Sequence, residues 1–168
     1  DLRTIEPTVM KRILPVVLLF VSFFSTNLNA QTFIWAERIS GTSVQLPHDI
    51  VVDDNGSNYS CGWTVGNTSF GSNSLSGNSY DGYVVKYDKD GDYQWSRGIT
   101  GTLYQSAFQI ERDADDGVYV AGWFYGSITI GDTSISGTNA DYDAYLVKFD
   151  TNGNFKWVRT QSGAGYTK

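Results

Sequence analysis

The stretch GYVVKYDKDGDYQW, residues 82–95, returns sixty-two positions later as AYLVKFDTNGNFKW, residues 144–157. The tryptophans that close these stretches belong to a longer series, Trp35, Trp95 and Trp157, whose members lie 60 and 62 residues apart. A period near 60 residues is typical of stacked supersecondary units, each of which cannot bury its apolar faces alone. The repeat therefore restricts the chain to an architecture of similar units that pack side by side.

Each period contains four short strand-like runs, separated by turns rich in Asp, Asn and Gly that tolerate positive φ and close hairpins. The runs are 48–53, 58–64, 83–87 and 93–99 in the first unit and 108–113, 118–124, 145–149 and 155–160 in the second. Four antiparallel strands per repeat are typical of a β-propeller blade. The sequence predicts an all-β fold: a partial β-propeller with two complete four-stranded blades and one orphan N-terminal strand.

These patterns divide the chain into an upstream translated segment, a signal peptide and a partial propeller. The predicted boundaries are 1–9, 10–30 and 31–168, with a closing strand at 33–40, blade one at 46–101 and blade two at 106–163. Because residues 33–39 match a fourth strand that has no blade of its own, we expect them to complete the last blade of a ring. Two blades cannot close a ring of four to eight, so we expect the remaining blades in the same polypeptide.

The signal peptide is indicated by basic Lys11 and Arg12, an apolar run over 13–24 and a polar stretch that ends at Ala30. Twelve apolar residues span about 18 Å as a helix, whereas a bilayer core is about 30 Å thick. We therefore expect export, with no transmembrane anchor in this segment, to a secreted, extracellular or cell-surface location.

Composition narrows the choice of partners. The net charge is −6 and the pI about 4.5, so the chain lacks the basic face that coats nucleic-acid phosphates. Charged residues make up only 18% of the chain, while aromatic residues reach 15%. We expect no nucleic-acid partner.

The repeat also argues against a catalytic centre. The one histidine, His48, aligns with Phe108, and the one cysteine, Cys61, aligns with Ala121. Both positions therefore accept side chains without acid–base or nucleophilic chemistry. We assign no catalytic residue and no cofactor, and we interpret the repeated tryptophans as packing between blades.

One acidic turn is a weak candidate for a metal site. Asp88, Asp90 and Asp92 offer three carboxylates in five residues, like part of a calcium loop, but Ile99 occupies the place where such a loop carries glutamate. The equivalent turn, 150–154, keeps one carboxylate of the three. Hairpin turns held by hydrogen bonds are the alternative interpretation.

The segments between the second and third strands are candidates for a binding surface, because loops carry function more often than cores. Phe70 and Ile130, each followed by glycine, predict a small hairpin in each blade. Phe70, Tyr80, Tyr125 and Tyr142 are weak candidates for contact with a glycan or a surface protein. Loops that merely face solvent are the alternative interpretation.

The stretch VYVAGWFYG, the FG and IG hairpins and the pattern D.YLVKFD..G...W resemble the bacterial β-propeller repeat known as SBBP. The resemblance covers about 33–165 and implies an exported surface protein. A second pattern, Asp-x-x-Gly-x-x-x-Trp at 88–95 and 150–157, is similar to the tryptophan-docking motif of pyrroloquinoline-quinone propellers. It differs by one residue in spacing, and the chain lacks the cysteine pair of those dehydrogenases.

From these patterns we expect a secreted or cell-surface, non-catalytic propeller for adhesion or for ligand or protein binding. Two alternatives remain open. The chain could belong to a propeller hydrolase or lyase whose catalytic residues lie in further blades, or to an assembly scaffold of the cell envelope, since fold alone does not settle function.

Overall fold

The computed structural model describes residues 34–77, 79–137 and 141–162, and all of its regular elements are β-strands. The predicted upstream segment, the signal peptide, Phe33 and Gly163 lie outside the described residues. No helix long and apolar enough to cross a membrane is found in the described part of the chain.

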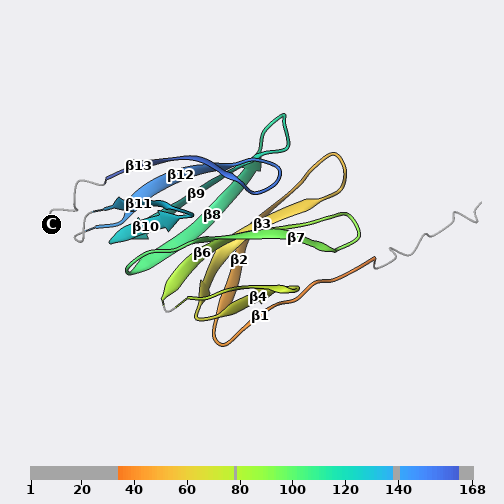
Figure 1. The fold of residues 1–168 in the computed structure, drawn as a ribbon, viewed down its shortest axis with the longest axis horizontal. Helices are drawn as coiled ribbons and strands as arrows, with labels where there is room; N and C mark the ends of the chain where they lie inside the picture. The colour runs from red at the N-terminus through yellow and green to blue at the C-terminus, as the bar shows by residue number, and fades with distance from the viewer. Residues whose placement is uncertain (1–33, 78, 138–140, 163–168) are drawn as a thin grey trace, which may run out of the picture. The chain divides into compact units, whose positions relative to one another are not determined.

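Two four-stranded antiparallel groups follow one another along the chain, and a single parallel bridge between Tyr80 and Tyr104 joins them into one eight-stranded sheet (Figure 1). Blade one consists of β2 (Gln45–Val52), β3 (Asn58–Val65), β6 (Tyr80–Tyr87) and β7 (Tyr93–Ile99). Blade two consists of β8 (Tyr104–Arg112), β9 (Val118–Tyr125), β12 (Asp143–Phe149) and β13 (Phe155–Gln161). The two predicted blades are thus confirmed, and the fold is a partial β-propeller.

The first strand of each blade begins earlier than the sequence pattern predicts. A bulge interrupts the register between Pro47 and Asp49 in β2, and another does so between Ala107 and Gln109 in β8. A bulge shifts which residues face the core. On the N-terminal side of the bulge, the alternation of inward and outward side chains is therefore out of phase with the rest of the strand. For this reason the start of the strand cannot be located from the sequence periodicity.

Four aspartates shape the turns that join strands one and two, and strands three and four, of each blade. In every case one carboxylate oxygen accepts hydrogen bonds from the backbone N–H groups two and four residues ahead, at 2.9 to 3.0 Å. The aspartates are Asp53, Asp88, Asp113 and Asp150. Because an aspartate at this position satisfies two turn N–H groups, its recurrence explains why the hairpins close at the same places in both blades.

A small hairpin lies between the second and third strands of each blade, as predicted. It is formed by β4 (Thr68–Phe70) and β5 (Asn73–Leu75) in blade one, and by β10 (Ser127–Ile130) and β11 (Thr133–Ser136) in blade two. The segment after β7 pairs with the hairpin of blade two. Thr100, beyond β7, exchanges two backbone hydrogen bonds with Thr129 of β10, at 2.7 and 3.0 Å.

The orphan N-terminal strand is β1 (Ile39–Gly41), which pairs with β4. It is shorter than the strand expected over 33–39, because residues 34–38 have no strand partner. A fourth strand needs a third strand beside it, and the described residues offer none that is free at this position. The last residues of the segment nevertheless pair with the next hairpin, as Thr100 does.

The repeated tryptophan docks onto the following blade. The indole N–H of Trp95 donates to the carbonyl of Thr151 at 3.0 Å, and its ring lies 6.4 Å from that of Phe149. Trp35 repeats the arrangement, since its indole N–H donates to Lys89 O at 2.9 Å. The packing role predicted for these tryptophans is confirmed.

Each docked indole lies against a glycine of the turn. A Cβ on Gly153 would come 2.6 Å from Trp95, and one on Gly91 would come 2.8 Å from Trp35. Both glycines have positive φ, +74° and +88°. Burying an indole contributes about 4 to 6 kcal/mol of gross transfer free energy, so this contact is a major source of cohesion between the blades.

Candidate binding surface

Eight rings form a continuous series of contacts at the blade interface, which we call the aromatic cluster. Adjacent ring centroids lie 4.3 to 6.4 Å apart, within the range of favourable aromatic pairs. In order of contact the members are Trp63, Tyr80, Tyr104, Tyr125, Tyr142, Trp123, Phe108 and His48.

Part of the aromatic cluster recurs in each blade. Trp63 of β3 packs against Tyr80 of β6 at 4.9 Å, and Trp123 of β9 packs against Tyr142 at 4.6 Å. The two pairs occupy equivalent positions in the repeat. A Trp–Tyr pair that every blade carries is best explained by its contribution to packing within that blade.

Tyr104 and Tyr125 have no aromatic counterparts in blade one, where Val44 and Val65 stand at the equivalent positions. Tyr104 lies 5.1 Å from Tyr80 and 6.4 Å from Tyr125. These two side chains therefore join the Trp–Tyr pairs of the two blades into one surface. Because the blade architecture does not require them, they are the members most indicative of a function.

The aromatic cluster is open to solvent. Tyr80, Tyr104, Phe108 and Tyr142 are 41%, 40%, 50% and 57% exposed. Contiguous exposed rings of this kind mark binding surfaces, because soluble proteins otherwise avoid them.

Three of the four predicted binding residues, Tyr80, Tyr125 and Tyr142, lie in this cluster. The expectation for Phe70 is wrong, because its side chain is fully buried and packs 5.0 Å from Tyr83. Phe70 belongs to β4, where the pleat turns it toward the core. The tyrosine missed by sequence reasoning, Tyr104, could have been found by asking where one repeat has an aromatic side chain and the other an aliphatic one.

His48 ends the aromatic cluster beside Phe108, at 4.3 Å between ring centroids. Its Nδ1 lies 2.9 Å from the carbonyl oxygen of Ala107 in blade two, the geometry of an N–H donor. The histidine thus bridges the two first strands.

Four aspartates directly adjoin members of the aromatic cluster in sequence: Asp49, Asp81, Asp141 and Asp143. Asp81, which follows Tyr80, is buried, and this burial raises the pKa of its carboxyl although the backbone N–H of Gly101 donates to it. A carboxyl with a raised pKa loses its charge more readily.

The acidic turn at 88–92 does not gather its carboxylates around one point. The carboxylate of Asp88 accepts two turn N–H groups at 3.0 Å and the side-chain amide of Gln94 at 2.8 Å. Asp90 pairs with Lys89 at 2.5 Å. No group of three potential metal ligands comes together in the described part of the chain, where Asp92 also lies.

Cys61 is fully buried, and this burial raises the pKa of its thiol to about 12. A thiol with so high a pKa carries almost no thiolate at neutral pH and is a poor nucleophile. The repeated lysines also have structural partners: Lys148 pairs with Asp113 at 2.5 Å, and Lys86 lies 3.7 Å from Asp53.

Comparison with known proteins gives one relative of note. An uncharacterised WD repeat-containing protein of Acanthamoeba polyphaga mimivirus is 32% identical over 92 residues, which is 51% of this chain and 7% of the viral protein. The chain therefore matches only a small part of that relative's length. No family model matches the sequence. The similarity to a repeat protein agrees with the partial β-propeller of the structure, whose two blades dock through repeated tryptophans.

Proposed function

We propose that the protein is an exported surface β-propeller that binds carbohydrate through the aromatic cluster. The observation that carries the proposal is the exposed, continuous series of rings. Tyr104 and Tyr125 belong to this series although packing of the blade does not require aromatic side chains at their positions.

Carbohydrate suits this surface for chemical reasons. The C–H faces of sugar rings pack on aromatic faces, while tyrosine hydroxyls exchange hydrogen bonds with sugar hydroxyls. The aspartates that adjoin the rings disfavour an anionic ligand by repulsion, which favours a neutral polar one. Adhesion to a polysaccharide follows if several such contacts act together.

Export is supported by the order of segments over residues 10–30, a basic start followed by an apolar run and a polar stretch. The resemblance to the SBBP repeat supports it as well. Residues 10–30 lie outside the described part of the structure, so this element of the proposal depends on the sequence. Detection of the protein in the culture medium or on intact cells, with its N-terminus beginning near Gln31, is the expected result. Retention inside the cell with an intact N-terminus contradicts it.

The binding test uses substitutions that the repeat itself supplies. Tyr104→Val and Tyr125→Val introduce the residues that blade one carries, so both variants are expected to fold. Binding to a polysaccharide array, followed by titration with the best oligosaccharide, should weaken roughly tenfold in the double variant, since an aromatic contact contributes about 0.5 to 1.5 kcal/mol.

Leu103→Val is the matched control, because Leu103 neighbours Tyr104 in sequence and is 37% exposed but carries no ring. It should bind like the unmodified protein. A double variant with unchanged affinity removes the aromatic cluster from the proposal. Failure of the unmodified protein to bind any polysaccharide, together with capture of a protein ligand, replaces carbohydrate with protein as the partner.

A further inference from the structure

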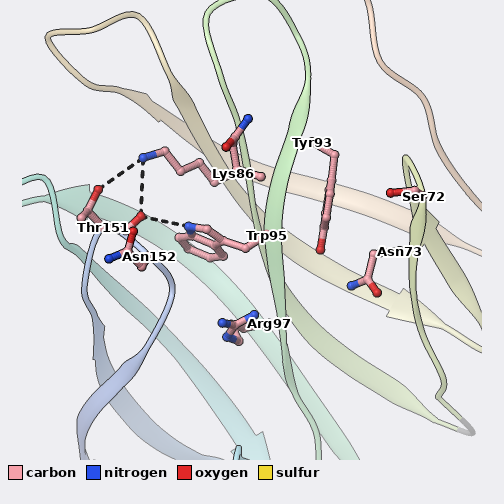
Figure 2. Close-up of a pocket in the computed structure, with 9 residues that line it drawn as sticks. Ser72, Asn73, Lys86, Tyr93, Trp95, Arg97, Thr151 and Asn152 are labelled. Atoms are coloured by element: carbon pink, nitrogen blue, oxygen red, sulfur yellow. Dashed lines mark hydrogen bonds between the residues drawn. The ribbon is translucent and has the colours of Figure 1, made fainter.

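A pocket of about 660 Å³ opens where blade one meets the last turn of blade two (Figure 2). Its floor includes Trp95 and Arg97 of β7, and Thr151 and Asn152 of the turn between β12 and β13 form one wall. Figure 2 shows Lys86 reaching toward Thr151, with an Nζ–Oγ1 distance of 3.3 Å. The pocket lies near the end of β6, whereas Tyr80 of the aromatic cluster begins that strand. The two sites are therefore separate, and a ligand in this pocket is independent of carbohydrate binding at the aromatic cluster.

The lining of this pocket is cationic in an acidic protein. None of its nine lining residues is Asp or Glu, while Lys86 and Arg97 are both present. The chain as a whole carries a net charge of −6. The charge of Lys86 is partly offset by buried Asp53 at 3.7 Å, so Arg97 is the main source of positive potential.

Arg97 is held in place but keeps donors to spare. Its Nε donates to the carbonyl of Gly153 at 2.6 Å, its Nη1 donates to Ser96 O at 2.7 Å, and the guanidinium lies 5.7 Å from the Trp95 ring. Within the described ranges, Arg97 has no carboxylate within ion-pair distance and its Nη2 makes no hydrogen bond. An oriented guanidinium with free N–H groups is well suited to an oxyanion, which it can bind through parallel hydrogen bonds.

The repeat shows that the fold does not require this charge. At the preceding docking contact, Glu37 stands where Arg97 stands, and Asp90 stands where Asn152 stands. Trp35 nevertheless docks there with the same indole hydrogen bond, at 2.9 Å. Docking is thus compatible with acidic side chains at both positions, so the hydrogen bond from Arg97 to Gly153 O is not a requirement for seating the indole.

We propose that this pocket binds an oxyanion, a carboxylate, sulfate or phosphate group of a polar ligand, with Arg97 as its principal contact. The hydroxyl of Thr151 and the side-chain amides of Asn152 and Asn73 supply further polar contacts around the bound group. The Trp95 ring closes one side and lowers the local dielectric, which strengthens the ionic contact.

The test follows backbone amide resonances and the Trp95 indole N–H by NMR during titration with sodium sulfate, sodium phosphate or sodium glucuronate. Sodium chloride at equal ionic strength is the reference. Saturable shifts at Trp95, Thr151 and Asn152 with at least one of the three anions, and none with chloride, are the expected result. The anion that binds most tightly identifies the ligand group.

Two variants borrow the residues of the first docking contact. Arg97→Glu should weaken binding about tenfold to a hundredfold, because a hydrogen bond to a charged group is lost and a repulsive charge is gained. Asn152→Asp changes an exposed position and should weaken binding because the new carboxylate repels the anion. If Arg97→Glu does not fold, Asn152→Asp still tests the proposal.

Arg159→Glu is the matched control. Arg159 lies over Trp157 at the same 5.7 Å distance that separates Arg97 from Trp95, but it does not line the pocket. Its substitution should leave the affinity within about twofold of the unmodified protein, since long-range surface charge is screened by salt. The proposal is overturned if none of the three anions binds saturably, if chloride gives the same shifts, or if Arg97→Glu and Asn152→Asp bind as tightly as Arg159→Glu.

Discussion

Replacing Gly153 with alanine measures how firmly Trp95 is seated on the second blade. A Cβ at this position would lie 2.6 Å from Cδ2 of the indole, and the backbone has a φ of +74°. The left-handed backbone costs an alanine about 1 to 2 kcal/mol. Forcing the ring away from its seat adds about 1 to 3 kcal/mol, the usual cost of overpacking. We therefore expect Gly153→Ala to lower the free energy of unfolding by about 2 to 5 kcal/mol.

Gly131→Ala separates the two contributions. Gly131 also has a positive φ, +57°, but no atom lies within 4 Å of the position that a Cβ would take. This control should therefore show the backbone cost alone, about 1 to 2 kcal/mol. The excess in Gly153→Ala over Gly131→Ala reports the contact with Trp95.

Urea denaturation followed by far-ultraviolet circular dichroism gives each free energy of unfolding by linear extrapolation. In a Trp95→Leu background, Gly153→Ala should cost no more than Gly131→Ala, because the ring that obstructs the Cβ is gone. Equal costs for the two alanines in the unmodified protein, or an unchanged cost of Gly153→Ala after removal of the ring, would refute the docking argument.

Three further predictions concern stability, charge and reactivity. Ile110→Ala should lower the free energy of unfolding by about 2 to 5 kcal/mol, because the Ile110 side chain is only 2% exposed. Ile50→Ala, at the equivalent place in blade one, should lower it by less than about 0.5 kcal/mol, because Ile50 is 61% exposed. Comparable losses for the two variants in urea denaturation would contradict this difference in burial. A hydrogen bond from Lys148 lowers the pKa of Asp113. The contribution of Asp113 to stability is therefore complete above about pH 4, the pKa of an aspartate in the unfolded chain, and is lost as the pH falls through its lower pKa in the folded protein. Asp113→Asn should accordingly lose less stability between pH 5 and pH 2.5 than the unmodified protein, and a parallel decline in the two would disprove it. Cys61, whose pKa burial raises to about 12, should resist a thiol-specific maleimide at pH 8 until urea unfolds the protein; rapid labelling of the folded protein would show that the thiol is accessible.

Much of the fold follows from local sequence. Alternating side chains specify each strand, and Asp-rich turns with glycine specify where the chain reverses. Because the same strand and turn signals occur in both repeats, the strand limits predicted for one repeat can be compared with those predicted for the other. The blades, the paired hairpins and the docking tryptophans were predictable for this reason. The starts of β2 and β8 were not, since a bulge breaks the alternation there.

The candidate site could be predicted only in part. Tyr80, Tyr125 and Tyr142 were predictable as candidates because they are aromatic residues in or next to the segments between the second and third strands. The prediction did not require knowledge that their rings lie in one cluster. Phe70 had the same appearance in sequence but is buried by the pleat of β4. Whether an aromatic side chain in a short hairpin faces solvent depends on the sheet above it, which sequence spacing does not reveal.

The sequence by itself determined that this chain repeats a four-stranded unit, where the unit turns and which tryptophan links it to the next. Only the tertiary structure decided which rings from the two blades touch, and that Arg97 lies beside the turn of the other blade with free donors. The physical reason is the range of the forces involved. Strand pleating and turn geometry depend on neighbouring residues. Contacts between the blades instead join residues 56 positions apart, and whether these meet depends on how the strands of the two blades twist and pack.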